Sequence, residues 1–369
     1  MRTQAKRVPL HLFFVLCGAF CAMLALSTSL LLSACGSSQG QGQVPAEIAE
    51  DQGSDDGATE EGPTPKNETG DLTASNETGT EDGEGPDGST TTEVAEDPEP
   101  VYNTELQERL QPLLAEAASA SGMQVGIAVI DLTDGTPISY QGDLRLPSAS
   151  MIKLLVASAL LQQIDAGALS LDQTHVLSAD EIVGGSGSLA GLGVGASVTL
   201  ERLLSAMIEE SDNTATNALI DVLGMDEINA EAKRLGLSET SLNRRMMDER
   251  AVAEGRENYA CADDLASILR AAHEGTLASP ELCEVLVADL ERQQDWGGIR
   301  SGLPEGVTFA HKTGALGYVN HDGGIVEGEH PYVLVVLCGG EGFYEGGALA
   351  TMAKVASLTH ETITAQPEG

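Results

Sequence analysis

Residues 185–220 read GSGSLAGLGVGASVTLERLLSAMIEESDNTATNALI. The stretch begins as a glycine-rich loop that lacks the Gly-Lys-Ser/Thr ending of a phosphate-binding loop. Apolar periodicity then predicts a helix over Leu200–Glu209 and another over Ala215–Leu223. The triplet Ser211-Asp212-Asn213 lies between them, and either of its last two residues is suited to cap the second helix. The stretch therefore predicts a polar triplet fixed between two helices.

A second motif, Ser150-Met151-Ile152-Lys153, opens a helix predicted over Ser150–Ala166. This helix is apolar nearly all round, which is typical of burial on every side. A spacing of three places Ser150 and Lys153 on one face, near a helix start whose N–H groups can stabilise an oxyanion. Burial would lower the lysine pKa, so that the amine can act as the base that a serine nucleophile needs. The alternative, a capping serine with a surface lysine, fits poorly with so apolar a helix.

A third motif, Lys312-Thr313-Gly314, begins the turn after a strand predicted over Val307–Lys312. Four further strands are expected at Met123–Leu132, Pro137–Tyr140, Asp322–Val326 and Tyr332–Cys338. Further helices are expected at Glu105–Ala118, Met225–Leu235, Asp263–His273, Pro280–Gln293 (capped by Ser279) and Gly347–Ile363. This order predicts an α+β fold: a five-stranded antiparallel sheet flanked by the N- and C-terminal helices, with an all-helical lobe inserted between its second and third strands.

S-x-x-K, S-D-N and K-[ST]-G, in this order, are the motif set of class A β-lactamases and penicillin-binding proteins. Together with the order of elements, they make most of residues 101–365 resemble the class A β-lactamase family. The resemblance implies that Ser150 is the nucleophile, that Ser211 relays a proton to the leaving nitrogen, and that Asn213 holds the acyl side chain. It also implies an oxyanion hole formed by the N–H groups of Ser150 and Ala315.

The same resemblance gives the third motif a role in binding. Lys312 and Thr313 would bind the substrate carboxylate as a charge and a hydroxyl, and Gly314 would let substrate lie along the strand edge. His321 and Asp322 fall where the family often places a second carboxylate-binding group.

The chain departs from the family at the step that releases the product. In class A β-lactamases, a loop after the helical lobe carries a glutamate that activates the deacylating water. Alignment of residues 240–244, TSLNR, with the entry of that loop puts Met246 where the glutamate belongs. A methionine cannot activate water, so fast turnover of β-lactams is not implied.

The sequence does not decide which ion pair holds this loop in place. Arg244 matches the arginine that begins the loop, but its usual acidic partner falls near Glu257 or Asn258. If the loop bulges, Asp248 or Glu249 could supply the missing carboxylate.

Three cysteines belong to the folded part: Cys261, Cys283 and Cys338. An odd number excludes complete pairing, and a Cys261–Cys283 disulfide is left open. Cys338 lies in an apolar strand and is expected in the core. None has a histidine at metal or nucleophile spacing, so neither a metal nor a cofactor is expected. Trp296 is expected to serve packing rather than function.

The chain begins with a targeting segment. A basic start and an apolar run lead to Leu32-Ser33-Ala34-Cys35, which resembles a bacterial lipobox. We expect a lipoprotein signal peptide at residues 1–34, a lipid on Cys35, and an extracytoplasmic protein anchored to the bacterial cell membrane. The alternative is a transmembrane anchor, since the run approaches the ~20 apolar residues that span a bilayer. Either segment is separate from the fold.

Residues 35–100 are rich in Gly, Ser, Thr, Asp and Glu and carry much of the net charge of −38. Such a composition predicts a disordered acidic tether, because it cannot bury enough apolar surface to fold. The acidity argues against nucleic-acid binding. Residues 101–369 then form the catalytic domain, which we expect to act as a monomer.

The leading hypothesis is a serine acyl-hydrolase of the class A β-lactamase type that forms an acyl-enzyme on Ser150 and hydrolyses β-lactams. The second is a D-alanyl-D-alanine peptidase, or penicillin-binding protein, with slow deacylation because of Met246. The third is a penicillin sensor without turnover, and it is disfavoured because no sensor bundle or output domain is visible.

Overall fold

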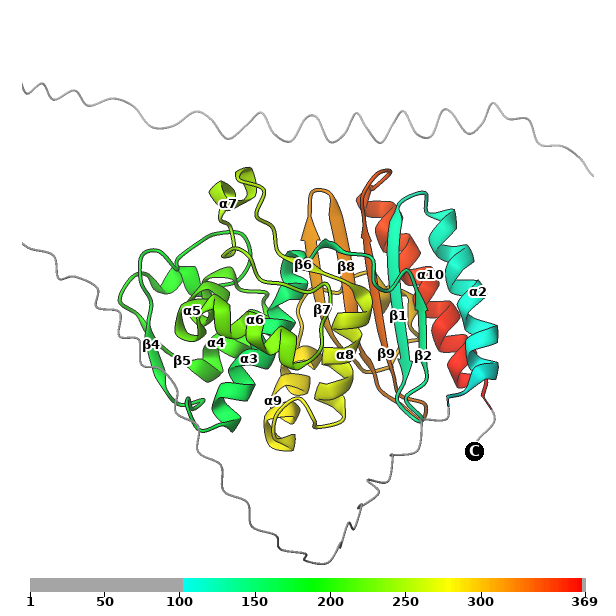
Figure 1. Ribbon diagram of the computed structural model, residues 1–369, viewed down its shortest axis with the longest axis horizontal. Helices are drawn as coiled ribbons and strands as arrows, with labels where there is room; N and C mark the ends of the chain where they lie inside the picture. The colour runs from blue at the N-terminus through cyan, green and yellow to red at the C-terminus, as the bar shows by residue number, and fades with distance from the viewer. Residues whose placement is uncertain (1–101, 367–369) are drawn as a thin grey trace, which may run out of the picture. The chain divides into compact units, whose positions relative to one another are not determined.

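In the computed structural model, which describes residues 102–366, five strands form one antiparallel sheet in the order β2-β1-β9-β8-β7 (Figure 1). The strands are β1 Gln124–Asp131, β2 Pro137–Tyr140, β7 Phe309–Leu316, β8 Val319–Val326 and β9 Tyr332–Gly339. Every residue of the central strand β9 is buried, as expected for a strand covered on both faces. The predicted fold class is confirmed.

The two terminal helices of the described part cover one face of the sheet. They are α2, Thr104–Ala120, and α10, Glu345–Thr364, and Figure 1 shows them side by side. Leu110 and Leu114 of α2 are fully buried in a core with β9. The ends of the two helices are also joined, because Asn103 Nδ2 donates to Gln366 Oε1 at 2.8 Å.

The opposite face packs on the helices that lead into the inserted lobe, and both share one apolar core. Helix α3, Lys153–Asp165, lies deep in this core, and its first nine residues are all buried. The other helices of this half are α4 Leu200–Glu209, α5 Asn213–Leu223, α6 Met225–Arg234, α7 Glu249–Ala253, α8 Ala262–His273 and α9 Pro280–Glu291. The minor strands are β3 Leu146–Pro147 with β6 Tyr259–Ala260, and β4 Thr174–Val176 with β5 Ser197–Thr199.

Most predicted elements differ from the structure by a few residues at their ends, and two of these differences affect the site. The helix predicted from Ser150 begins with a 3₁₀ turn, η2, at Ala149–Ile152. Strand β7 continues to Leu316, because β8 starts at Val319 and pairs with it across a tight turn. Lys312-Thr313-Gly314 therefore lies inside the strand, and the prediction that it begins a turn is wrong. Ser279 stands at the N-cap position of α9, but its side chain makes no capping hydrogen bond.

Several side chains settle what the sequence left open. Cys261, Cys283 and Cys338 are all buried and free, so the first two do not form a disulfide. Trp296 is 71% exposed, and the expectation that it packs in the interior is wrong, because it lies in a surface loop after α9.

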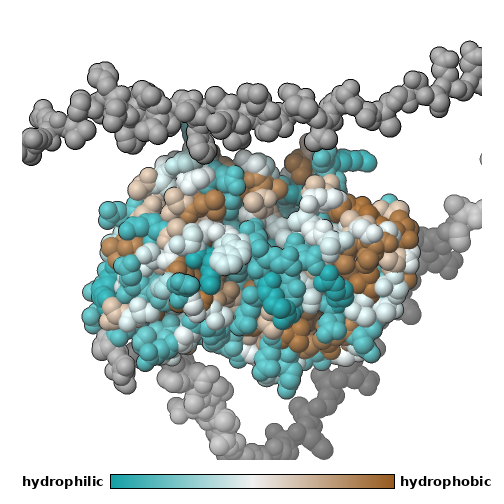
Figure 2. Space-filling view, turned by 180° about the vertical axis from the view of Figure 1, so that it is seen from behind, coloured by the Kyte–Doolittle hydropathy of each residue, from teal (hydrophilic) through white to brown (hydrophobic). Residues whose placement is uncertain are grey.

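The surface of the described part is mixed in character. Figure 2 shows hydrophilic residues over the middle of one face and apolar residues gathered at its right-hand side, over the helical lobe. Exposed large apolar side chains of this lobe are Val176, Leu192 and Val194. Among residues 102–366, no helix has the length and apolarity needed to cross a membrane. The predicted signal peptide, Cys35 and the predicted tether lie outside the described residues.

Candidate active site

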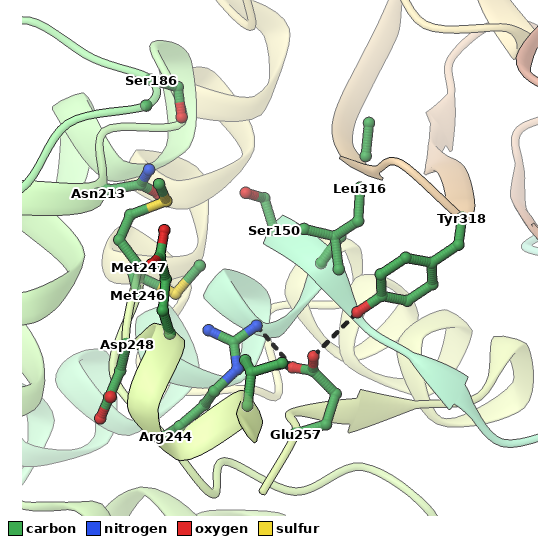
Figure 3. Close-up of a pocket in the computed structure, with 15 residues that line it drawn as sticks. Ser150, Ser186, Asn213, Arg244, Met246, Met247, Asp248, Glu257, Leu316 and Tyr318 are labelled. Carbon is green, nitrogen blue, oxygen red and sulfur yellow. Dashed lines mark hydrogen bonds and ion pairs between the residues drawn. The ribbon is translucent and has the colours of Figure 1, made fainter. Parts of the chain in front are cut away.

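A cavity of about 480 Å³ lies beside Ser150, at the edge of the sheet formed by β7 (Figure 3). Its wall combines residues of η2, the S-D-N motif, the end of β7 and the loop that carries Met246. The lining residues are Ala149, Ser150, Gly185, Ser186, Asn213, Arg244, Met246, Met247, Asp248, Glu249, Val252, Glu257, Ala315, Leu316 and Tyr318. Ser150 of the first motif, Asn213 of the second and Ala315, which follows the third, thus meet at one cavity, although they are far apart in the sequence.

Ser150 is held in a strained turn against the sheet. The preceding residue, Ala149, has φ of 47°, a left-handed conformation that is costly for a non-glycine residue. A Cβ on Gly314 would come within 3.0 Å of the backbone nitrogens of Ser150 and Met151. The glycine of the third motif is therefore required for the close packing of β7 on the nucleophile turn.

Two buried lysines converge on the hydroxyl of Ser211. Lys153 Nζ donates to Ser211 Oγ at 3.1 Å, and Lys312 Nζ donates to the same oxygen at 3.0 Å. Lys153 also donates to Asn213 Oδ1 at 3.0 Å. Among the described residues, no group forms a hydrogen bond with the Ser150 hydroxyl, which is therefore free to face the cavity. The structure thus joins Lys153, Ser211 and Lys312 by hydrogen bonds, and Asn213 connects this cluster to the cavity that Ser150 lines.

Burial changes the acid–base chemistry of both lysines, neither of which is exposed to solvent. Desolvation, with a smaller contribution from the positive charge of Lys312, holds the pKa of Lys153 well below its usual range. Desolvation lowers the pKa of Lys312 to about 7, although Asp295 and Asp322 act in the opposite direction. Lys153 is therefore suited to accept a proton near neutral pH.

The glycine-rich loop is shaped to fit the S-D-N motif. Gly185 and Gly187 both have φ of 95°, and a Cβ on either would collide with Asn213 or Asp212. Asp212 caps α5 by accepting from Ala215 N at 2.7 Å, which settles which residue of the triplet is the cap. Asn213 uses one amide hydrogen on the Gly184 carbonyl. Its second amide hydrogen is left for the cavity.

Met246 is fixed in position by an asparagine that the sequence did not single out. Asn217 Oδ1 accepts from Met246 N at 2.8 Å, and Asn217 Nδ2 donates to Met246 O at 3.3 Å. Met246 is 7% exposed and lines the cavity, next to Met247 (Figure 3). An apolar thioether therefore stands where the alignment places the deacylating glutamate.

The loop around Met246 is closed by a buried ion pair. Arg244 Nη2 lies 2.6 Å from Glu257 Oε1, so the partner left open by the sequence is Glu257. Tyr318, in the turn between β7 and β8, donates to Glu257 Oε2 at 3.2 Å and ties the loop to the sheet (Figure 3). The carboxylate of Asp248 caps α7 by accepting from Ala251 N, and it points away from Ser150 in Figure 3.

Two residues suggested for binding are buried and make other hydrogen bonds. His321 is fully buried, bonds to the Pro147 carbonyl and accepts from Cys338 N. Asp322 is also fully buried and bonds to His311 and to Ile299 N. The expectation that they form a second carboxylate-binding group is wrong, because both faces of the sheet are covered at β8.

The threonine of the third motif has an acidic neighbour that the sequence did not single out. Thr313 Oγ1 donates to Asp295 Oδ2 at 3.0 Å. Asp295 belongs to an irregular segment after α9, where no periodicity or motif indicates its position.

A serine in a strained turn, beside two buried lysines that share a second serine hydroxyl at the edge of this α+β sheet, defines a serine hydrolase of the penicillin-recognising type. The comparisons agree. The sequence model of the family Beta-lactamase2, "Beta-lactamase enzyme family", matches residues 105–363. The chain belongs to this family and is a β-lactamase-like serine hydrolase.

Individual relatives are moderately similar. The beta-lactamase Toho-2 of Escherichia coli is 32% identical over 238 residues, which cover 61% of this chain and 79% of that protein. The crystal structure of a beta-lactamase from Sphaerobacter thermophilus DSM 20745 is 32% identical with a TM-score of 0.64, covering 71% of this chain and 99% of that one. A PBP-A mutant, solved as an acyl-enzyme complex with penicillin G, is 26% identical with a TM-score of 0.63, covering 71% and 97%.

Proposed function

We propose that the chain forms an acyl-enzyme on Ser150 with β-lactams and hydrolyses that acyl-enzyme slowly. One observation carries the proposal: Ser150, Asn213 and Ala315 line a cavity together with Met246, and Asn213 is hydrogen-bonded to Lys153 of the buried lysine pair. The relatives support the acylation step, because Toho-2 is a beta-lactamase and a PBP-A mutant forms an acyl-enzyme with penicillin G.

The proposed acylation needs only groups that line or adjoin the cavity. Neutral Lys153 takes the proton of Ser150, and the serine oxygen attacks the lactam carbonyl. The backbone N–H groups of Ser150 and Ala315 stabilise the oxyanion. The lactam C–N bond then breaks, Ser211 donates its proton to the leaving nitrogen, and the proton held by Lys153 restores the Ser211 hydroxyl.

Deacylation is the step that this site supports poorly. Water must lose a proton as it attacks the ester, and the Met246 thioether cannot accept one. Loss of a positioned general base costs roughly 10²–10⁴-fold in rate. This favours a second candidate function, a D-alanyl-D-alanine peptidase or penicillin-binding protein, which acylates in the same way and is inhibited by β-lactams.

Intact mass spectrometry of the soluble domain with penicillin, followed over time, distinguishes these functions. We expect a stoichiometric adduct that disappears slowly with release of hydrolysed penicillin. An adduct that never decays would indicate a penicillin-binding protein or a sensor. The absence of any adduct would rule out the proposal, and so would an adduct that persists on Ser150→Ala.

We also propose a lipid anchor at Cys35, which lies outside the described residues. The proposal rests on the lipobox-like sequence Leu32-Ser33-Ala34-Cys35. Palmitate labelling in a bacterial host should require Cys35, and the Cys35→Ser protein should lose its membrane association. Membrane retention of Cys35→Ser would indicate an uncleaved transmembrane anchor instead.

A further inference from the structure

An acidic side chain of the chain itself occupies the position expected for a substrate carboxylate. The Thr313 hydroxyl donates to Asp295 Oδ2 at 3.0 Å, and Gly297 N donates to Asp295 Oδ1 at 3.3 Å. Asp295 is exposed, whereas Thr313 is 5% exposed. The hydroxyl that would recognise an anion is therefore already bonded to one.

The charges around this threonine do not favour a second anion. Lys312 supplies the positive charge, but burial lowers its pKa to about 7. Two carboxylates, Asp295 and Asp322, act on the same lysine. Arg300, in the adjacent 3₁₀ turn, lies over the exposed ring of Trp296 at 5.6 Å and donates to a backbone carbonyl. Thr313 thus has one weakened cation and one exposed acid, Asp295, beside it, and the buried Asp322 adds a second negative charge near the lysine.

We propose that Asp295 determines specificity by selecting substrates that carry an uncharged carboxamide, rather than a carboxylate, beside Thr313. A carboxylate must displace Asp295 or lie against it, and like charges placed together in a binding site disfavour binding. A carboxamide can accept from Thr313 through its carbonyl and donate an N–H to Asp295, so every polar group is satisfied. This inference rests on the proposed function, because it concerns the substrate of the same acylation reaction.

The acylation rates of penicillin G and of its carboxamide test the inference on the full chain. They are compared for wild type, Asp295→Asn and Glu291→Gln, at about pH 6 so that Lys312, with its pKa of about 7, stays protonated. Glu291→Gln removes the same charge from the exposed end of α9, four residues earlier in the chain, without touching Thr313. We expect Asp295→Asn to raise the second-order acylation rate with penicillin G roughly 10- to 100-fold. The rate with the carboxamide should stay the same or fall.

The ratio of the acylation rates with penicillin G and its carboxamide distinguishes an effect on specificity from a general loss of structure in the site. If Asp295 only positioned Thr313, its replacement would change both rates alike, and the inference would be overturned. An equal change of the ratio in Glu291→Gln would also overturn it, because a general charge effect would then explain the result. Absence of an adduct with either compound in all three proteins would instead overturn the proposed function, and this inference with it.

Trp296 provides a second measurement that does not depend on acylation. It is the single tryptophan of the chain and follows Asp295 directly, so its fluorescence should report occupation of this subsite. In the Ser150→Ala background, penicillin G should bind more tightly once Asp295→Asn is added, and the carboxamide should not. Equal affinities for penicillin G with and without Asp295→Asn would contradict the proposal.

Discussion

Lys153 and Lys312 are both fully buried, and each has a proton equilibrium that experiment can follow. Lys153→Ala should reduce acylation of Ser150 by roughly 10²–10⁴-fold near neutral pH, because a general base contributes about that much. In wild type, the acylation rate should rise with pH until it passes the lowered pKa of Lys153. Stopped-flow acylation across pH provides the measurement. An unchanged rate in Lys153→Ala would show that another group is the base.

Lys312 should weaken the fold most at low pH. Its pKa is about 7 in the folded chain, whereas an unfolded lysine titrates near ~10.4. Between these values the unfolded chain binds more protons, so the free energy of unfolding rises with pH. The destabilisation is complete below about pH 7 and disappears above ~10.4. We expect Lys312→Met to be more stable than wild type at about pH 6, by on the order of 2–5 kcal/mol, and this advantage to shrink toward pH 10. Urea unfolding at both values gives the comparison, and an advantage independent of pH would contradict it.

Met246 controls how long the acyl-enzyme lasts. The wild-type enzyme should show a burst of product followed by slow turnover, and Met246→Glu should accelerate deacylation by up to roughly 10²–10⁴-fold. Asn217 binds the Met246 backbone on both sides, so the substitution should keep the loop in place. Asp248→Ala and Glu249→Ala are the controls. If wild type shows no burst and either control creates one, that carboxylate is the base and the alignment is wrong.

Among the elements, strand β7 and the 3₁₀ turn η2 meet at Gly314. Gly314→Ala would press a methyl group against two backbone nitrogens at 3.0 Å, which one element can relieve only by moving. We expect a loss of roughly 1–3 kcal/mol in stability, and about tenfold or more in acylation, because misplacement of a nucleophile is costly. Gly317→Ala, in the adjacent turn with open space around it, is the matched control. Equal melting temperatures and acylation rates for the two variants would show that the packing of β7 on η2 tolerates a methyl group at residue 314.

The elements also show what the sequence can and cannot predict. Periodicity located α4 and β2 to the residue, because each has a clear apolar pattern and a distinct start and stop. It misjudged β7, since pairing with β8 extends the strand through polar Lys312 and Thr313. Motif order indicates that Lys153, Ser211 and Lys312 belong to one site, but the hydrogen bonds of both lysines to the Ser211 hydroxyl are seen only in the structure.

Tertiary contacts such as those of Asn217 and Asp295 leave no comparable pattern in the sequence. Asn217 is one of several polar residues of α5, and Asp295 lies in an irregular loop. Their roles depend on tertiary packing, which places Met246 beside Asn217 and Thr313 beside Asp295. His321 and Asp322 were assigned from their alignment position, which cannot tell an accessible side chain from one covered by a neighbouring layer.

At the scale of the whole molecule, the acidic segment should be separable from catalysis. Residues 36–100 contain almost no apolar side chains, so their composition gives them nothing to pack on the domain. Their deletion should leave the melting temperature and the acylation rate unchanged. Differential scanning fluorimetry and burst kinetics provide the measurements. A loss of several degrees would show that this acidic segment binds the folded part.

The pairing of α2 with α10 has a consequence for the topology of the chain. Asn103 and Gln366 hydrogen-bond to each other across the beginning and end of the described part. The two ends of the described part therefore lie next to each other. A short linker between these residues, with new termini opened in the exposed loop near Gly193, should give a circular permutant that still folds, as is common when chain ends lie close together.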